Sequence, residues 1–474
     1  MPIKNEITVV VGKDKVKATA RGGAARTGPV KLERLRLATI RVFEELLLDD
    51  KIQNRRHMEV LGQHLYAAIL DGDVGLLIDE KLAEVDKDRL RLQLQFEPDV
   101  DREIASLPWE FLYSPTRAEF LATDVNLVLS RYLELGFDRE LFPEEERPLR
   151  ALVVISRPSN ERPVLAKEVV AAIRDLNIEG HEAIVDVKVV EHTTLQAIED
   201  ALREHQPHIF HFIGHGNYNP TTRTGYLSLI NSEDSTSEHC DDSTLIERFK
   251  NSQCFPRLVF LHMCEGGLSE KDLSLQAFSG FAPKLIHAKI PSVVAMQYPI
   301  KNEHARDFSK NFYQALADGA SVDEAVQEGR RRLDMYRRSR VFGTPILYMH
   351  SASTLIMPKQ RRSDPNKSNV PSEQKTDAPG DTSVPTQVTE TTSPLEAAPD
   401  VLELVISRGF QAAKMFPVGE NRARLRKHLI DMNVELKGKT RTDIFNAVFE
   451  AWESEGSPEI KAVWYSIMQD SNVL

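Results

Sequence analysis

Apolar and polar positions alternate along the chain with two different periods, and each period predicts one type of element. Residues 32–48 and 58–70 carry apolar positions at helical spacing, which predicts two helices. Residues 90–96 alternate between apolar and polar positions, which predicts a half-buried strand with its polar face in water. Shorter apolar runs predict a strand at 7–11, a core segment around Trp109 at 107–113, and another strand within 120–132.

From residue 150 onward, strand-like and helix-like segments alternate regularly. Strands are predicted at 151–155, 183–190, 209–213, 258–263, 290–296 and 346–349, and a short strand or hairpin at 226–230. Helices are predicted at 165–176, at 195–202 with Thr194 as the N-cap, and at 243–249, 278–287, 303–317 and 322–336. Such alternation is typical of βαβ units. We therefore expect an α/β fold with a mostly parallel central sheet that the last strand closes.

The composition changes in the C-terminal quarter. Residues 358–400 contain seven of the chain's 25 prolines and are rich in small polar residues, which predicts a disordered linker. Residues 401–474 regain helical spacing and predict a small helical domain. The sequence thus divides into an α/β half at 1–149, a second α/β domain at 150–357, the linker and the helical domain.

Composition narrows the class of protein. The chain has 474 residues, 41% of them apolar and 28% charged, as in ordinary globular proteins. Its net charge of −11 argues against a nucleic-acid partner. The three cysteines, Cys240, Cys254 and Cys264, are too few for a disulfide framework and suit a reducing compartment. Because no apolar run approaches the ~18 residues of a membrane span, we expect a cytoplasmic protein without a membrane partner.

Two of the predicted strands end at residues that can carry chemistry. The strand at 209–213 is followed by His215 and Gly216, and the strand at 258–263 is followed by Cys264. The carboxyl ends of neighbouring parallel strands share one crevice, so the imidazole and the thiol can meet there. A cysteine attacks carbonyl groups as the thiolate and needs a nearby base, for which His215 is the candidate. The backbone amides of Gly216 and Cys264 are candidates for binding the oxyanion.

Other interpretations compete with this one. A single buried cysteine or a single histidine at a strand end is commonly structural, and it is their joint occurrence that favours chemistry. The histidines at 205, 208, 211 and 215 suggest a metal site, but positions 208 and 211 point to opposite faces of a strand, so we expect no metal. No phosphate-binding loop is present, and we expect no cofactor. We interpret one set of arginines as a solvated helix face rather than a binding surface, those at 330–332, 337, 338 and 340.

Ordered motifs around these residues resemble those of a known family. The chain resembles the CHAT family of caspase-like cysteine peptidases, relatives of separase and the caspases, at 210–216, 264–265, 290–300 and 342–348, and upstream at 107–113 and 120–132. The resemblance covers about residues 58–352. It implies a caspase-like α/β sandwich whose upstream half is a non-catalytic, pseudo-protease-like lobe. It also implies that His215 and Cys264 form the catalytic dyad and that Gly216 is the oxyanion glycine.

The sequence departs from that family beside the candidate nucleophile. The family often has Asn-Ala before the cysteine, where this chain has His262-Met263, which leaves the dyad intact and alters the pocket wall. With His262 at that position, an aspartate that marks cleavage after arginine or lysine is missing. Arg157 occupies a place comparable to that of a caspase arginine that binds an acidic side chain before the scissile bond. Arg157, His262 and Gln297 are therefore the candidate substrate-binding residues.

We expect a cysteine endopeptidase that cleaves a protein substrate when a partner recruits or activates it. The resemblance to prokaryotic conflict and cell-death systems implies a role in defence, with residues 401–474 as an adaptor that binds an upstream sensor or a second copy of the chain. The rival hypothesis is a catalytically silent caspase-like scaffold that signals through its helical domain. The substrate, the activating signal and the oligomeric state do not follow from the sequence.

Overall fold

The computed structural model describes most of the first 350 residues. The described residues are 5–48, 52, 55–85, 89–134, 148–161, 164, 166–177, 183–219, 224–263, 274–298, 300–337 and 340–350. All of them belong to one compact unit, Met1–Lys359. Cys264, the predicted linker at 358–400 and the predicted helical domain at 401–474 lie outside the described residues.

In its described residues, the N-terminal half begins with three strands, continues with three helices, and ends with four strands that have short helical turns among them. Its strands are β1 (Glu6–Val11), β2 (Lys15–Ala20), β3 (Ala25–Pro29), β4 (Leu90–Phe96), β5 (Tyr113–Ser114), β6 (Glu119–Phe120) and β7 (Leu127–Tyr132). Its helices are α1 (Arg34–Leu48), α2 (Arg55–Ile69), α3 (Asp73–Ala83) and α4 (Arg102–Ala105), with 3-10 turns η1 (Trp109–Phe111) and η2 (Leu121–Thr123).

The C-terminal half alternates strands and helices, as its sequence predicts. Its strands are β8 (Leu149–Ile155), β9 (Val185–Val190), β10 (Ile209–Gly214), β11 (Gly216–Asn219), β12 (Thr224–Ile230), β13 (Ser237–Asp241), β14 (Leu258–Met263), β15 (Ser292–Met296) and β16 (Pro345–Met349). Its helices are α5 (Lys167–Arg174), α6 (Leu195–His205), α7 (Asp242–Asn251), α8 (Ser274–His287), α9 (Asn302–Ala317) and α10 (Val322–Arg337), with the 3-10 turn η3 (Arg340–Gly343).

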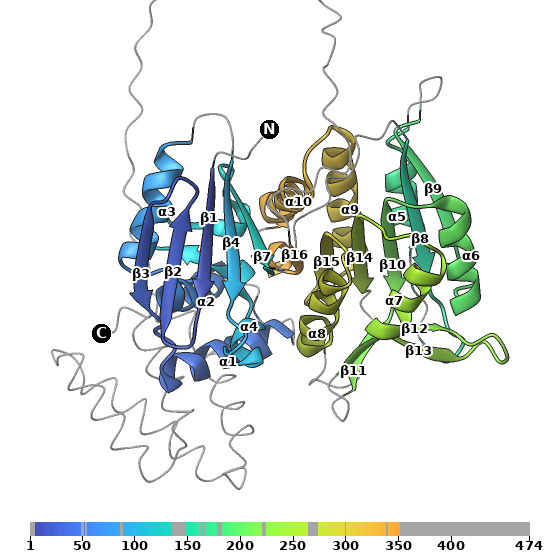
Figure 1. Cartoon of the computed structure of the whole chain (residues 1–474), viewed down its shortest axis with the longest axis horizontal. Coiled ribbons are helices and arrows are strands. Elements are labelled where there is room, and N and C mark those ends of the chain that lie inside the picture. The colour runs from blue at the N-terminus through green and yellow to red at the C-terminus, as the bar shows by residue number, and fades with distance from the viewer. Residues whose placement is uncertain are drawn as a thin grey trace, which may run out of the picture. The chain divides into compact units, whose positions relative to one another are not determined.

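One eleven-stranded sheet runs through both halves (Figure 1). Its strand order is β3-β2-β1-β4-β7-β16-β15-β14-β10-β8-β9. Neighbouring strands are parallel except at β3–β2, β2–β1 and β16–β15. The predicted α/β fold with a mostly parallel central sheet is thus confirmed. β16 pairs with strands of both halves, so it lies in the middle of the sheet rather than closing it at an edge.

Helices cover both faces of the sheet in the C-terminal half. On β10, the ring of Phe210 contacts Phe249 of α7 at 5.4 Å between centroids, and the ring of His211 contacts Tyr313 of α9 at 5.9 Å. Successive residues of a strand point to opposite faces, so α7 and α9 lie on opposite sides. Two-sided burial explains why β10 and β14 appear in the sequence as nearly continuous apolar runs.

The strand β4 departs from its predicted solvation. Its polar residues Arg91 and Gln93 are buried instead of facing water. Nε of Arg91 donates to Oδ2 of Asp323 at 2.7 Å, and the hydroxyl of Thr8 donates to Oε1 of Gln93 at 3.3 Å. β4 lies between β1 and β7, and Asp323 belongs to α10, so the polar side of this strand faces other parts of the protein. The alternating pattern predicted the strand correctly, but its prediction that the polar face lies in water is wrong.

Some elements agree with the sequence in detail and others were missed. Thr194 caps α6 as predicted, because its hydroxyl accepts from the Ala197 amide at 3.2 Å. Trp109 is fully buried and its ring N–H donates to the Ile104 carbonyl at 3.1 Å, which confirms the predicted core segment. The elements missed were β2, β3, α3, α4, β11, β13 and the turn η3. In the described part of the chain, no helix has both the length and the apolar character needed to cross a membrane.

Candidate active site

The strands that carry the predicted histidine and cysteine, β10 and β14, are parallel neighbours in the sheet. Their register pairs Gly214 with Met263, and the offset of 49 positions (263 − 214 = 49) is kept along both strands. The same offset separates His215 from Cys264 (264 − 215 = 49). Neighbouring strands lie about 4.8 Å apart, and the described parts of β10 and β14 end side by side, at Gly214 and Met263, which directly precede His215 and Cys264 in the sequence. Cys264 itself lies outside the described residues.

His215 connects the large sheet to a small one. β10 ends at Gly214, and β11 begins at Gly216 as the first strand of the three-stranded sheet β11-β12-β13. The carbonyl of His215 accepts from the Ser228 amide at 3.0 Å, so the backbone of His215 is already hydrogen-bonded to β12. The His215 side chain is 6% exposed. Two sheets therefore fix the backbone that carries the imidazole.

Ser156 holds the loop after β8 against both sheets. Its amide donates to the Ile213 carbonyl at 2.9 Å, and its hydroxyl donates to the Ser228 carbonyl at 2.6 Å. Gly214 packs beside it without room for a side chain, because a Cβ there would lie 2.5 Å from the Phe212 ring and 3.1 Å from Cβ of Ser156. This close packing is the physical reason for the glycine that precedes His215.

The amide of Gly216 points away from β12. Hydrogen-bonded and non-hydrogen-bonded residue pairs alternate along antiparallel strands. The Ser228 amide bonds to the His215 carbonyl, so the next pair, Gly216 with Leu227, is non-hydrogen-bonded. The N–H of Gly216 is thus directed to the side of β11 opposite β12. That direction is the one the predicted oxyanion role requires, since an amide used within the sheet could not bind a ligand.

A carboxylate lies beside the imidazole. Oε2 of Glu161, from the turn after β8, is 4.0 Å from Nε2 of His215. Glu161 also acts on Tyr226 of β12, where burial, with a further contribution from the Glu161 carboxylate, raises the pKa of the hydroxyl. The ring of Tyr226 stacks on His239 of β13 at 3.8 Å between centroids. An acid, a base and an amide donor therefore gather where β10 passes into β11.

Comparison with known proteins decides the family. The family model described as "CHAT domain" matches residues 55–374, more than half of the chain. The chain belongs to the CHAT domain family. The family predicted from the sequence motifs is confirmed, and it is a family of the cysteine peptidase type. No curated protein matches this CHAT protein.

Two solved structures of the Saccharomyces cerevisiae separase–securin complex, at 2.6 and 3.0 Å resolution, are similar to the CHAT protein. Each shares 12% sequence identity with it, and the TM-scores are 0.30 and 0.32. The similarity covers 60% and 67% of this chain and 18% and 22% of the matched chains. The CHAT protein therefore spans less than a quarter of the length of those chains.

Two histidines of the CHAT domain are buried below the strand ends. Nδ1 of His211 lies 3.1 Å from the Tyr313 hydroxyl, and its ring stacks on Phe260 at 4.1 Å between centroids. The ring of His262 lies 5.8 Å from that of His211, and burial lowers the pKa of His262 to about 4. Burial also lowers the pKa of His211 well below its usual value, so both rings are neutral near pH 7. His262 was predicted to contact a substrate, but it is fully buried, so such a contact would require a local rearrangement.

The structure separates the other histidines of the metal interpretation. Nδ1 of His208 accepts from the Arg150 amide at 3.1 Å, at the opposite end of β10 from His215. His205 lies on α6, where its Nδ1 is 3.9 Å from Asp186. The described residues of the CHAT protein contain no group of three or more side chains arranged to hold a metal ion.

Arg157 of the CHAT protein lies on the loop after β8, four positions before Glu161. Its Nε donates to the Val164 carbonyl at 3.0 Å, and its Nη1 donates to Glu191 at 3.1 Å. The guanidinium thus already has a carboxylate partner within the protein. Binding of an acidic substrate side chain by Arg157 stays a prediction, and it would have to compete with Glu191.

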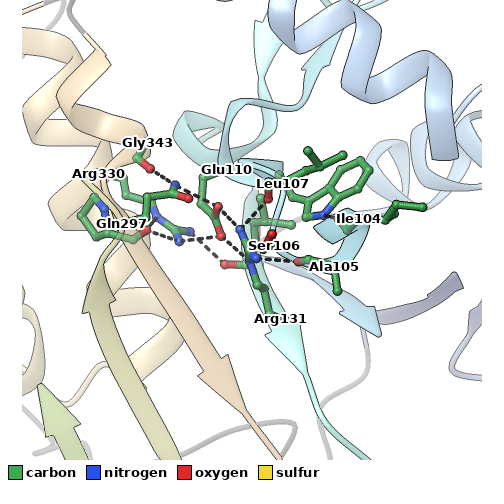
Figure 2. Close-up of polar contacts among 12 residues, drawn as sticks. Ile104, Ala105, Ser106, Leu107, Glu110, Arg131, Gln297, Arg330 and Gly343 are labelled. Carbon is green, nitrogen blue, oxygen red and sulfur yellow. Dashed lines mark hydrogen bonds and ion pairs between the residues drawn. The ribbon is translucent and has the colours of Figure 1, made fainter. Parts of the chain in front are cut away.

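Gln297 follows β15 directly and enters a buried polar cluster (Figure 2). Its Nε2 donates to Oε2 of Glu110 at 3.1 Å and to the Gly343 carbonyl. Arg131 binds both oxygens of Glu110, at 3.0 Å through Nε and at 2.6 Å through Nη2. Gln297 is 1% exposed. Its contact with a substrate stays a prediction, and in the structure it lies where the two halves of the CHAT protein meet.

The predicted solvated arginine face is wrong at Arg330 and Arg340. Arg330 is fully buried; its guanidinium donates to the Leu129 carbonyl at 2.9 Å and lies 4.0 Å from Oε1 of Glu110. Arg340 is also buried, 5.8 Å from the ring centroid of Tyr298. Because an α-helix turns once every 3.6 residues, neighbouring arginines project in different directions. Arg331 and Arg332 do project outward, where both bind Glu328.

Two glutamates were missed by the sequence analysis, Glu110 beside Gln297 and Glu161 beside His215. Glu110 interrupts an apolar run at 107–113, and a charge inside such a run is a signal for a buried residue with a partner. Glu161 had no comparable signal, because it lies among polar loop residues. Its position beside His215 becomes visible only in three dimensions.

Proposed function

We propose that the protein is a cysteine endopeptidase with His215 as the base and Cys264 as the nucleophile. The observation that carries the proposal is the register of β10 and β14, whose next positions are these two residues. Membership of the CHAT family and the outward direction of the Gly216 amide support it.

The proposed reaction passes through a covalent intermediate on Cys264. His215 takes the thiol proton, and the thiolate attacks the carbonyl carbon of the scissile peptide, so that a C–S bond forms. The amides of Gly216 and Cys264 stabilise the oxyanion. The C–N bond then breaks, and the imidazolium returns the proton to the leaving amine. A water molecule, deprotonated by His215, hydrolyses the thioester and releases the carboxylic acid and the free thiol.

Selective alkylation of the cysteines tests the nucleophile. Burial raises the pKa of the Cys254 thiol to about 11, and burial also raises the pKa of Cys240. Both thiols should therefore react slowly with iodoacetamide at neutral pH, whereas Cys264 should react fast if His215 activates it. Peptide mass mapping gives the modified residue. Labelling of Cys254 or Cys240 before Cys264 would contradict the assignment.

Loss of cleavage in Cys264→Ala tests the activity itself. The full-length protein and the variant are incubated with a cell lysate, and new N-termini are identified by mass spectrometry. We expect cleavage by the wild type and by the matched control Cys254→Ala, and none by Cys264→Ala. If wild type and Cys264→Ala give the same set of N-termini, the protein is no peptidase and the scaffold hypothesis replaces the proposal.

We also propose that residues 401–474 act as the adaptor that recruits the peptidase to a sensor protein, or to a second copy of itself, in a defence or cell-death response. A tethered module raises the effective concentration of its partner without fixing the geometry. Deleting 401–474 should abolish partner capture and activation in cells while Cys264 still reacts with iodoacetamide. Unchanged activation in cells would show that the segment is not the adaptor.

A further inference from the structure

Glu161 lies in a turn that the small sheet holds in place. The Ser159 amide donates to the Ser235 carbonyl at 2.9 Å. Asn160 makes two bonds to Ser237, donating from Nδ2 to the hydroxyl at 3.0 Å and accepting from the amide at 2.8 Å through Oδ1. Three hydrogen bonds in the two residues before Glu161 therefore fix its backbone relative to β13. Such support is typical of side chains that must stay in one position.

The carboxylate that this turn presents is directed at the imidazole. Oε2 of Glu161 lies 4.0 Å from Nε2 of His215, and the Glu161 side chain is 22% exposed. The Oε2 atom is buried and has no hydrogen-bond partner among the described residues. Loss of water without a new donor disfavours a carboxylate. A donor from His215 would remove that cost, and catalytic hydrogen bonds are often long in the free enzyme and shorten in the complex.

Two other side chains could interact with Glu161: Arg157, which already has a carboxylate partner, and Tyr226, a phenol whose pKa is raised by burial and by the Glu161 carboxylate. Arg157, on the same loop, directs its guanidinium to Glu191 at 3.1 Å. Tyr226 from β12 and His239 from β13 stack on each other at 3.8 Å between centroids. Among the residues that the structure describes here, the imidazole of His215 is the group that lies beside the Glu161 carboxylate, with Nε2 at 4.0 Å from Oε2.

We propose that Glu161 is the positioning residue of the dyad: its carboxylate holds the Nε2–H of His215 and so leaves Nδ1 to take the proton of Cys264. The inference rests on the proposed function. When the proton passes from Sγ of Cys264 to Nδ1, the imidazole becomes a cation, and the carboxylate of Glu161 stabilises that charge. No proton moves to Glu161, and its contribution is to set the ring orientation and to stabilise the imidazolium.

A double-mutant cycle on the alkylation of Cys264 tests this inference without any peptide cleavage. The rate of reaction with iodoacetamide is measured for the wild type, Glu161→Ala, His215→Ala and the double variant, each in the full-length chain. Glu161→Ala should slow the reaction roughly 10- to 100-fold in the wild-type background. It should have no further effect in the His215→Ala background, because Glu161 acts through the imidazole.

Two more variants separate positioning from folding. Glu161→Asp keeps the carboxylate and should restore part of the rate. Glu233→Ala removes an exposed glutamate at the turn after β12 and should leave the rate unchanged. With a peptide substrate, Glu161→Ala should lower kcat by a similar factor and leave KM within about twofold, as expected for an interaction that acts on the chemical step.

Each alternative result has a definite meaning. Equal slowing by Glu161→Ala in both backgrounds would show a structural role and overturn the inference. An unchanged alkylation rate combined with a raised KM for substrates with arginine or lysine before the scissile bond would make Glu161 a specificity residue, which also overturns it. Failure of the proposed function looks different, because Cys264→Ala would then cleave as the wild type does.

Discussion

Replacing Glu110 by glutamine should destabilise the protein strongly, because two buried arginines face this carboxylate. Arg131 binds it through two hydrogen bonds of 3.0 and 2.6 Å, and a nitrogen of Arg330 lies 4.0 Å from it. The amide of Gln297 donates to it at 3.1 Å. Glutamine has the same shape as glutamate, so the substitution removes the negative charge and leaves the packing nearly intact.

The pKa shifts of the two guanidiniums show how far each one relies on Glu110. Burial by itself would lower the pKa of Arg131, but the Glu110 carboxylate, together with Tyr348 and Tyr298, outweighs it, and the pKa is raised. Arg330 lies farther from the carboxylate, and there burial prevails and lowers the pKa to about 10. Without Glu110, two buried positive charges would remain in one cluster. Removing one partner of a buried ion pair typically costs about 3–5 kcal/mol.

Urea unfolding of the full-length chain measures this cost. With an m-value of about 3 kcal/mol/M, a loss of this size lowers the urea midpoint by about 1 M or more. The matched control is Glu103→Gln, because this glutamate of α4 is 70% exposed and lies 3.4 Å from Arg41. An exposed pair contributes about 1 kcal/mol or less. If Glu110→Gln unfolded at the same urea concentration as Glu103→Gln, the carboxylate would not be what stabilises the buried arginines.

Two further variants test local parts of the fold. The pKa of His262 is about 4 in the folded protein and about 6.5 when unfolded. As pH falls, the unfolded state therefore binds this proton first, and stability is lost between about pH 6.5 and 4. Urea unfolding at pH 7 and at pH 5 measures the loss, and His262→Leu should make it about 2 kcal/mol smaller than in the wild type. An equal loss in both proteins would refute this. Gly62→Ala should lower the free energy of unfolding by about 1–3 kcal/mol, because its Cβ would lie 2.2 Å from the Phe111 carbonyl oxygen. The control is Gly28→Ala, where the Cβ would be 3.5 Å from its nearest atom, and this variant should leave the midpoint of thermal unfolding unchanged. Equal midpoints for these two alanine variants would show that α2 can move away from η1 at little cost.

The C-terminal half could be predicted from the sequence because its burial is regular. β10 and β14 are buried on both faces, so their residues form short apolar runs that end where the chain leaves the sheet. Parallel strands end at a common edge of a sheet, and this rule predicts His215 and Cys264 at the same edge. The prediction that these strands lie near each other needed only this rule, and the register of β10 and β14 confirms it.

Buried polar residues could not be predicted in the same way. Arg91 reads as the water-facing side of a strand, but its partner Asp323 lies 232 positions away in the sequence. Arg330 reads as part of a basic surface, and the carbonyl oxygens that it binds, on Leu129 and Pro345, carry no mark in the sequence. A polar residue indicates burial only once its partner is known. That knowledge requires the topology.

The place of β16 shows why the upstream half bears on the candidate site although it carries neither residue of the proposed dyad. β16 comes last in the described chain, yet it runs parallel to β7 and antiparallel to β15, so the sheet reverses direction between β16 and β15. Gln297, the first residue after β15, binds Glu110 of the upstream half and the carbonyl of Gly343 just before β16. β15 is also the direct neighbour of β14, the strand that leads to Cys264. The end of β15 is therefore fixed from the upstream side, and the strand beside it is the one that delivers the candidate nucleophile. The strands of the upstream half and those of the C-terminal half lie on two sides of one continuous sheet and meet where β7 pairs with β16, so both halves contribute to one frame for the site.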